Sequence, residues 1–238
     1  MSENNDIAVE LLVCDVMAIK PPQNACKSLS RAERQRLQGL PGAVQARLFL
    51  LGRYLLRQRL GQLLGEPPAA LDIGLNNRGK PELADRGWQF NLSHSGSLLA
   101  LAFSPCAPVG VDLESRQLDG PRITRLARRY LADAEQAWLA ESRQPAHDFQ
   151  RLWTVKEAVL KADGGGIANN LAGVEWQPGQ PLARFNGQPY RLFQGGLGHT
   201  SLTLAVAGEA GRLRRLSLGD CAPALEITGL QPNLAINP

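Results

Sequence analysis

The stretch Val109-Gly-Val-Asp-Leu-Glu114 lies near the middle of the 238-residue chain and ends in an alternation of apolar and acidic side chains. On a β-strand, side chains two positions apart point to the same face, roughly 6–7 Å from one another. The alternation therefore predicts a strand that buries Val111 and Leu113 and directs Asp112 and Glu114 to a common site. Carboxylate oxygens at this spacing suit Mg²⁺, although an ordinary polar outer face would have the same pattern.

The segments on either side of this strand repeat one order of elements: strand, helices, strands. Before it, we expect a strand at 7–16, a short helix opened by the capping box of Ser30 and Glu33, a long helix at 41–64, and strands at 71–75, 88–92 and 98–103. After it, we expect helices near 122–130, 133–141 and 148–162, strands at 174–176, 190–193, 201–207 and 213–218, and an aperiodic tail from Asp220. The repetition predicts an α+β protein of two similar halves, residues 1–108 and 109–238. A weak likeness between the helical stretches 52–57 and 156–161 supports a duplication.

The composition is that of an ordinary folded protein, with 44% apolar and 20% charged residues. It excludes disordered, collagen-like and mucin-like chains. A secretory signal requires a cation before its apolar run, and the first apolar run here has none before it. No apolar stretch approaches the roughly 18 residues of a membrane span. We therefore expect a cytoplasmic protein. The four cysteines lie far apart and have no histidine at ligand spacing, which supports neither a zinc site nor a disulfide framework.

The formal charge of +4 conceals two basic runs, at 27–59 and 116–129. The first contains eight basic residues and one acid, Glu33. Such runs are often no more than solvated helix faces. They also fit an anionic partner, which is a phosphate-bearing small molecule, an acidic protein surface or nucleic acid.

Two loop segments carry candidate chemistry. Gly74-Leu-Asn-Asn-Arg-Gly-Lys80 matches part of a phosphate-binding P-loop, but Pro81 replaces the magnesium-binding Ser or Thr and disfavours the helix that must begin there. We therefore reject a nucleoside triphosphatase and expect a turn that presents Lys80. Asn91-Leu-Ser-His-Ser-Gly96 is a polar segment expected between two apolar strands, where His94 either contacts an anion or is simply exposed.

The helix expected at 148–162 carries a further candidate set. Trp153, Glu157 and Lys161 follow one another at intervals of four residues and share one face, with Lys156 beside them. Taken alone, a Glu–Lys pair at this spacing is usually a surface ion pair.

In their order along the chain, these motifs resemble those of the 4′-phosphopantetheinyl transferases, specifically the surfactin-synthetase-activating (Sfp-type) group. That family is known by a G-K-P turn, an N-x-S-H-S-G segment, a G-x-D-x-E strand and a W-x-x-K-E-x-x-x-K helix, which are matched here by 79–81, 91–96, 110–114 and 153–161. The match spans about residues 29 to 167.

The resemblance implies transfer of 4′-phosphopantetheine from coenzyme A, as co-substrate, to a serine hydroxyl of an apo acyl, peptidyl or aryl carrier protein with an acidic surface. Adenosine 3′,5′-bisphosphate would be released. It also implies the 4′-phosphopantetheinyl transferase fold, with two α+β halves related by a pseudo-twofold axis and the active site between them, so that a monomer suffices. The sequence does not distinguish fatty-acid, polyketide and peptide-synthetase carriers.

The resemblance also assigns residues to roles. Asp112, Glu114 and Glu157 would bind Mg²⁺, or Mn²⁺, against the pyrophosphate of coenzyme A. Glu157 would take the serine proton, and Lys161 would stabilise or protonate the leaving group. Coenzyme A contacts are implied for Arg47, Lys80, Pro81, Ser93, His94, Asp112 and Lys161.

One departure from the family pattern is visible in the loop after the catalytic helix. Gly165 stands where relatives often carry Lys, which puts in doubt any phosphate or carrier contact of that loop.

Two alternatives stay open. A nucleic-acid-binding module would use the two basic runs, but these contain few aromatic side chains on which bases could stack. A degenerate relative would bind coenzyme A or a carrier without catalysis, against which stand the intact acids and Lys161. We expect neither nucleic acid nor a membrane as partner.

Overall fold

A computed structural model of the chain describes residues 8–83, 87–167, 170–209, 212–215, 226–227 and 236–237. The first half contains β1 (Ala8–Asp15), β2 (Ile19–Lys20), α1 (Arg31–Gln38), α2 (Ala43–Leu64), β3 (Ile73–Leu75), β4 (Pro81–Leu83), β5 (Gln89–Ser95) and β6 (Leu98–Ser104). The second half contains β7 (Val109–Glu114), α3 (Gly120–Tyr130), α4 (Asp133–Ala140), α5 (Pro145–Asp163), β8 (Glu175–Trp176), β9 (Leu182–Phe185), β10 (Gln188–Leu197) and β11 (Thr200–Ala207). Short 3₁₀ turns at Val16–Ala18, Ala25–Ser28, Pro68–Ala70 and Leu171–Gly173 join some of these elements.

The two halves have the same strand pairing. In the first, β1 pairs antiparallel with β6, and β6 with β5; in the second, β7 pairs antiparallel with β11, and β11 with β10. In each half a long helix, α2 or α5, precedes the strand hairpin. This order confirms the α+β fold of two similar halves. The segments β12 (Arg212–Arg215), β13 (Glu226–Ile227) and β14 (Ile236–Asn237) then return to pair with β1, β2 and β10.

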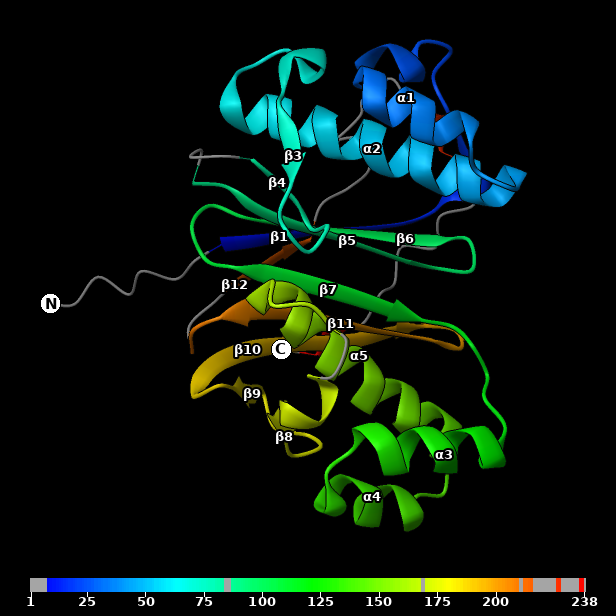
Figure 1. Cartoon of the computed structure of the whole chain (residues 1–238), viewed down its shortest axis with the longest axis vertical. Coiled ribbons are helices and arrows are strands. Elements are labelled where there is room, and N and C mark those ends of the chain that lie inside the picture. Colours follow the sequence, from blue (N-terminus) through cyan, green and yellow to red (C-terminus); the bar gives the residue numbers. More distant parts are fainter. Residues whose placement is uncertain are drawn as a thin grey trace, which may run out of the picture.

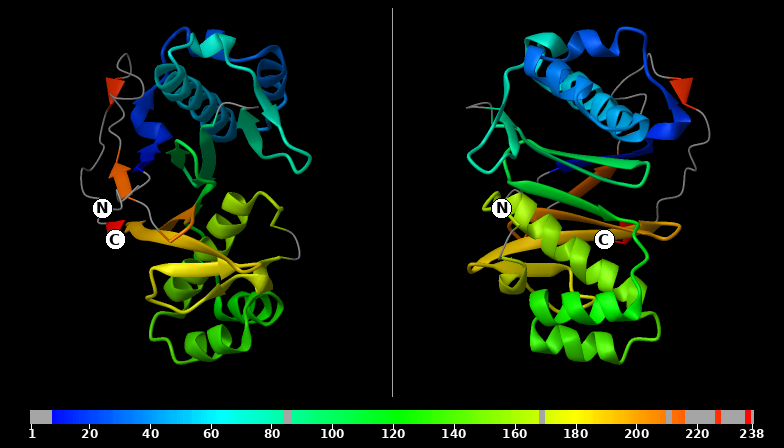
Figure 2. Two further views of the ribbon diagram at one scale, coloured as in Figure 1. Left: turned by 90° about the vertical axis from the view of Figure 1, so that its left-hand side faces the viewer. Right: turned by 45° about the vertical axis from the view of Figure 1, so that its right-hand side comes forward.

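The helices and sheets are stacked in layers (Figures 1 and 2). α1 and α2 lie at one end of the molecule over the first sheet, and α3, α4 and α5 lie at the other end against the second sheet. A middle core between the sheets joins the halves, and it includes Val9, Leu11, Val111, Leu113 and Leu204. As predicted, Val111 and Leu113 are therefore core residues.

A ladder of side chains joins β5 to β7, although these strands belong to different sheets. The side-chain oxygens of Asn91, Ser93 and Ser95 accept hydrogen bonds from the backbone N–H groups of 111, 113 and 115 at 2.9, 3.2 and 2.9 Å. Alternation along β5 points these three side chains to β7 while the backbone of β5 pairs with β6. The polar segment expected to be a loop at 91–96 is thus strand as far as Ser95, because β7 satisfies its polar side chains.

Close packing of α5 on β7 depends on Gly110. A Cβ at this position would collide with the backbone of Ala158 and Ala162, so only glycine lets the helix approach the strand this closely. The approach brings the polar face of α5 next to the acidic residues of β7.

Other expectations were met in part. The capping box of Ser30 and Glu33 opens α1, as expected. The segment that partly matches a P-loop forms a β3–β4 hairpin. Pro81 begins a strand there and not the helix that a P-loop needs, which agrees with the rejection of a nucleoside triphosphatase. The sequence predicts neither β4 nor β9, because these strands are short. Most of the tail after Asp220 lies outside the described residues.

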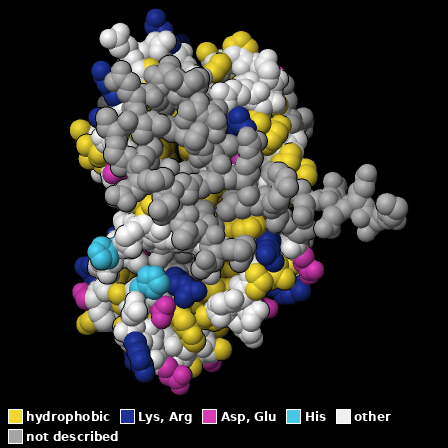
Figure 3. All heavy atoms as spheres, turned by 180° about the vertical axis from the view of Figure 1, so that it is seen from behind, with side chains coloured by type: hydrophobic (Ala, Val, Ile, Leu, Met, Phe, Trp, Pro, Cys, Tyr) yellow, Lys and Arg dark blue, Asp and Glu magenta, His cyan; other side chains and the backbone are white. Residues whose placement is uncertain are grey.

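Part of the first basic run is engaged within the protein, whereas Lys27, Arg31, Arg34 and Arg36 are exposed. Arg57 is buried and donates to Glu33 and to the carbonyl of Leu71, and Arg59 donates to Glu10. On the rear face of the C-terminal half, basic and acidic side chains are interspersed (Figure 3). No helix in the described ranges is both long and apolar enough to span a bilayer.

Candidate active site

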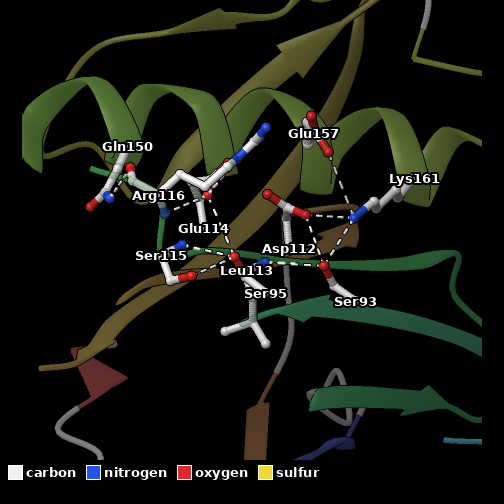
Figure 4. Close-up of polar contacts among 10 residues, drawn as sticks. All are labelled: Ser93, Ser95, Asp112, Leu113, Glu114, Ser115, Arg116, Gln150, Glu157 and Lys161. Atoms are coloured by element: carbon white, nitrogen blue, oxygen red, sulfur yellow. Dashed lines mark hydrogen bonds and ion pairs between the residues drawn. The ribbon is translucent and has the colours of Figure 1, made fainter. Parts of the chain in front are cut away.

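β7 and α5 direct their polar side chains into one pocket with a volume of about 320 Å³. Asp112 and Glu114 come from the strand, and Trp153, Glu157 and Lys161 come from the helix. Glu157 and Lys161 point from α5 towards Asp112 (Figure 4). The structure therefore brings together the acidic residues and the lysine that the sequence predicts.

Lys161 connects the two elements. Its Nζ lies 2.5 Å from Asp112 Oδ1 and 3.7 Å from Glu157 Oε2. It also donates to Ser93 Oγ at 3.1 Å, and the Ser93 hydroxyl donates to Asp112 Oδ1 at 2.9 Å. Ser93 thus holds the Asp112–Lys161 pair in place, and its hydroxyl proton is used within the protein.

Glu114 is held by Arg116. The guanidinium donates to both carboxylate oxygens, from Nε at 3.0 Å to Oε1 and from Nη2 at 2.5 Å to Oε2. Gln150 of α5 donates to the Arg116 carbonyl at 2.8 Å and fixes the backbone there. The Arg116 side chain is 70% exposed, whereas that of Glu114 is only 9% exposed, so the guanidinium lies between the carboxylate and solvent.

The pocket perturbs its acids unequally. Burial, and next the charge of Asp112, raises the pKa of Glu157 to about 7. Burial also raises the pKa of Asp112, and this effect outweighs the lowering of that pKa by Lys161 and Ser93. Burial alone would raise the pKa of Glu114, but the hydrogen bonds from Arg116 hold this pKa below its ordinary value. With this pKa, Glu157 can exchange a proton near neutral pH.

The donor set fits a magnesium ion. Mg²⁺ prefers oxygen ligands and usually takes one or two carboxylates together with water and substrate phosphates. Asp112, Glu114 and Glu157 line one pocket, and their like charges favour a cation among them. Within the described part of the chain, no three His, Cys, Asp or Glu side chains form a ready-made metal site. Lys161 and Arg116 instead hold two of the acids.

A larger pocket, with a volume of about 500 Å³, adjoins the first, and His94 and Lys161 line both. Its lining comes from both halves and includes Arg36, Phe49, Arg53, Arg78, Lys80 and Pro81 from the first half and Gly164, Gly166 and Ile167 from the second. Burial, and then the charge of Lys161, lowers the pKa of His94. Cationic groups beside apolar surface suit a ligand with phosphate groups and an apolar portion.

Lys80 lies in this lining but binds the end of α5. Its Nζ donates to the carbonyl of Lys161 at 2.6 Å, with the carbonyls of Val109 and Ala162 at 3.5 Å. A lysine at this place satisfies carbonyl groups that the helix end leaves unpaired and complements the negative end of the helix dipole. Burial lowers its pKa.

Arg47 is not part of either pocket lining. Its guanidinium donates to the carbonyls of Val16, at 2.7 Å, and Ile19. Three arginines that no sequence motif indicates do line the larger pocket, namely Arg36, Arg53 and Arg78. The Cζ atoms of Arg36 and Arg53 lie over the Phe49 ring, 5.4 and 5.5 Å from its centroid. The i, i+4 spacing of 49 and 53 on one helix is a signal that could have found Arg53.

Lys156 does not lie beside Glu157 and Lys161, contrary to expectation. It is fully buried, and its Nζ contacts Glu135 and the carbonyl of Val174, both at 2.8 Å, and the carbonyl of Leu171 at 3.1 Å. The residue faces the core because α5 is buried on the side away from the pocket as well. It ties α5 to α4 and to the segment after α5.

Fold and site together define a duplicated α+β protein with a pocket, lined by cationic and apolar side chains, between its halves. The chain belongs to the 4′-phosphopantetheinyl transferase superfamily: residues 108–207 match the model of that superfamily, and residues 21–106 match the model of the 4′-phosphopantetheinyl transferase N-terminal domain.

Individual relatives agree with this assignment. The chain is 37% identical over 152 residues to the 4′-phosphopantetheinyl transferase HetI of Nostoc sp., covering 61% of this chain and 64% of the relative. It is 34% identical over 146 residues to the 4′-phosphopantetheinyl transferase psf-1 of Bacillus pumilus, covering 60% and 59%. The aligned part thus spans about three-fifths of each relative.

Proposed function

We propose that the protein transfers the 4′-phosphopantetheine group of coenzyme A to a serine hydroxyl of an apo carrier protein and releases adenosine 3′,5′-bisphosphate. The supporting observation is that Lys161 and His94 line both pockets, so that a phosphate ligand in the larger pocket reaches the carboxylate cluster in the smaller one. Residues 1–108 would supply most of the coenzyme A wall, and residues 109–238 would supply the acids and the catalytic helix, within a single chain.

The reaction forms a bond between the serine oxygen and the β-phosphorus of coenzyme A and breaks the bond from that phosphorus to the bridging oxygen. The electron pair of the broken bond stays on the departing bisphosphate, and the serine proton must be accepted. Glu157, with a pKa of about 7, is suited to accept it. Lys161 would stabilise the charge that develops on the leaving oxygen. Asp112, Glu114 and Glu157 would hold Mg²⁺, which when bound offsets the charge of the pyrophosphate.

The second basic run supports an acidic carrier protein as partner. Its helix α3 buries Ile123 and Ala127 and leaves four arginines exposed, namely Arg122, Arg125, Arg128 and Arg129. Exposed cations of one sign attract an acidic surface and speed its encounter. We propose that this face of α3 receives the carrier.

The direct test is mass spectrometry of apo acyl and peptidyl carriers after incubation with the purified protein, coenzyme A and Mg²⁺. The expected result is a gain of one phosphopantetheine mass on the carrier serine, which is absent with a chelator. If no carrier in the panel gains this mass, the proposed function is wrong.

Asp112→Ala tests the site within that assay. Because it removes the carboxylate that Lys161 and Ser93 hold, we expect turnover to fall by about 10²-fold or more with an unchanged circular dichroism spectrum. Turnover equal to that of the parent protein would contradict the role given to Asp112.

A further inference from the structure

We propose that Arg78, in the turn between β3 and β4, is the cation that this turn offers to a phosphate group in the larger pocket, while Lys80 acts as a positioning residue for α5. The inference rests on the proposed function, because it takes the phosphate to be one of those of coenzyme A. It assigns to Arg78 a binding role that neither the sequence motif nor the family resemblance indicates.

The first observation is that the two cations of the turn differ in their partners. The three N–H groups of the Lys80 ammonium face three backbone carbonyls, those of Val109, Lys161 and Ala162. Arg78 is exposed and lines the larger pocket, and its guanidinium makes no hydrogen bond or ion pair with any other described residue. A guanidinium whose donors meet no acceptor among the described residues can bind a phosphate in the bidentate manner.

The second observation is that the turn holds Arg78 in place before any ligand arrives. Asn76 Oδ1 accepts hydrogen bonds from the backbone N–H groups of Arg78 and Lys80, each at 2.9 Å, and the Asn76 N–H donates to the Lys80 carbonyl at 2.9 Å. The grip of Lys80 on the end of α5 then fixes the turn against the second half. Little conformational freedom of the turn backbone is therefore lost when Arg78 binds a ligand.

The third observation is that the glycines after α5 leave room for the guanidinium. A Cβ on Gly166 would lie 3.2 Å from Arg78 Nη1 and 3.3 Å from Arg78 Cδ, and the φ of +86° at Gly166 disfavours any side chain there. Gly165 has no such positive φ, and a Cβ on it would lie 3.9 Å from Arg78 Nη1. A long side chain placed at 165 can therefore reach the position of the guanidinium, once the Asp163 carboxylate, which accepts a hydrogen bond from the Gly165 N–H at 2.9 Å, moves aside.

The test is calorimetric titration of the full chain with coenzyme A, without a carrier. We expect Arg78→Ala to weaken binding by about tenfold or more, because it removes a charged hydrogen-bond donor. The matched control is Arg143→Ala, which removes another exposed arginine that lines neither pocket. Both variants should unfold at the same temperature as the parent, since neither side chain is buried.

A rescue experiment tests the location. In the Arg78→Ala background, Gly165→Lys should recover part of the affinity, whereas Gly165→Gln, of similar length without the charge, should not. If the parent binds no coenzyme A, the proposed function fails and this inference with it. If the parent binds but R78A binds as tightly as R143A, or if the Lys and Gln variants at 165 bind equally, the inference alone is wrong.

Discussion

Glu157 is buried beside the negative charge of Asp112, so that its ionisation destabilises the folded protein when no metal is bound. Its pKa is raised to about 7 in the folded protein, against an ordinary value of 4.5. Between these two pH values the unfolded chain has released the proton and the folded one retains it, so stability is fully present below pH 4.5 and falls as the pH rises to 7. Each pKa unit corresponds to about 1.4 kcal/mol, so the loss from this group is at most about 3 kcal/mol.

Urea unfolding in a chelating buffer checks this, with Glu157→Gln as the matched variant, which keeps the shape and cannot ionise. The stability gained by E157Q over the parent should be larger at pH 8 than at pH 5. A gain that is equal at the two pH values would contradict the buried, coupled environment described for Glu157.

Residue positions could be predicted from the sequence where periodicity decides them. The i, i+2 spacing of Asp112 and Glu114 and the i, i+4 spacing of Glu157 and Lys161 place each pair on one face, and the structure shows both pairs in one pocket. The catalytic and binding roles of these four residues stay predictions. The partners of Arg47 could not be predicted, because they are carbonyls that lie 31 and 28 residues earlier in the chain.

Among the elements, α5 depends on a buried ion pair. Lys156→Met would remove the cation that contacts Glu135 and the carbonyls of Leu171 and Val174, and leave Glu135 buried with an uncompensated charge. We expect a loss of about 3–5 kcal/mol in the free energy of unfolding, as for other buried pairs broken at one partner. Chemical denaturation measures it.

The double variant K156M/E135Q is the control for this cause. The glutamine introduced by E135Q would still accept the hydrogen bond from the Ala132 N–H that Glu135 accepts at 2.8 Å, but it carries no charge. The double variant should therefore recover part of the stability lost by K156M. If it is no more stable than K156M, the buried charge is not the reason for the loss.

Helices were easier to predict than strands at the level of elements. α2 and α5 have long apolar patterns and clear ends, whereas β4 and β9 are too short to give a pattern. β5 differed for another reason: its serines and asparagine look like a loop, and only the amides of β7 explain why they occur in a strand.

For the whole molecule, the repeated order of elements predicted the duplication, but nothing local indicated how the halves are joined. The middle core and the ladder from β5 to β7 lie between segments that belong to different halves. Because both halves share this core, they are expected to unfold together rather than as separate domains.

The ladder supplies the last prediction. Asn91 is 6% exposed, so Asn91→Ala leaves the Val111 N–H buried without an acceptor, at a cost of about 1–3 kcal/mol. Ser95 is partly exposed, so water can replace its hydroxyl and Ser95→Ala should cost less. In calorimetry, N91A should lower the midpoint of one transition more than S95A does. A second transition in N91A would show that the halves unfold separately, and equal effects of the two variants would show that the ladder bond of Asn91 is not buried in the way described.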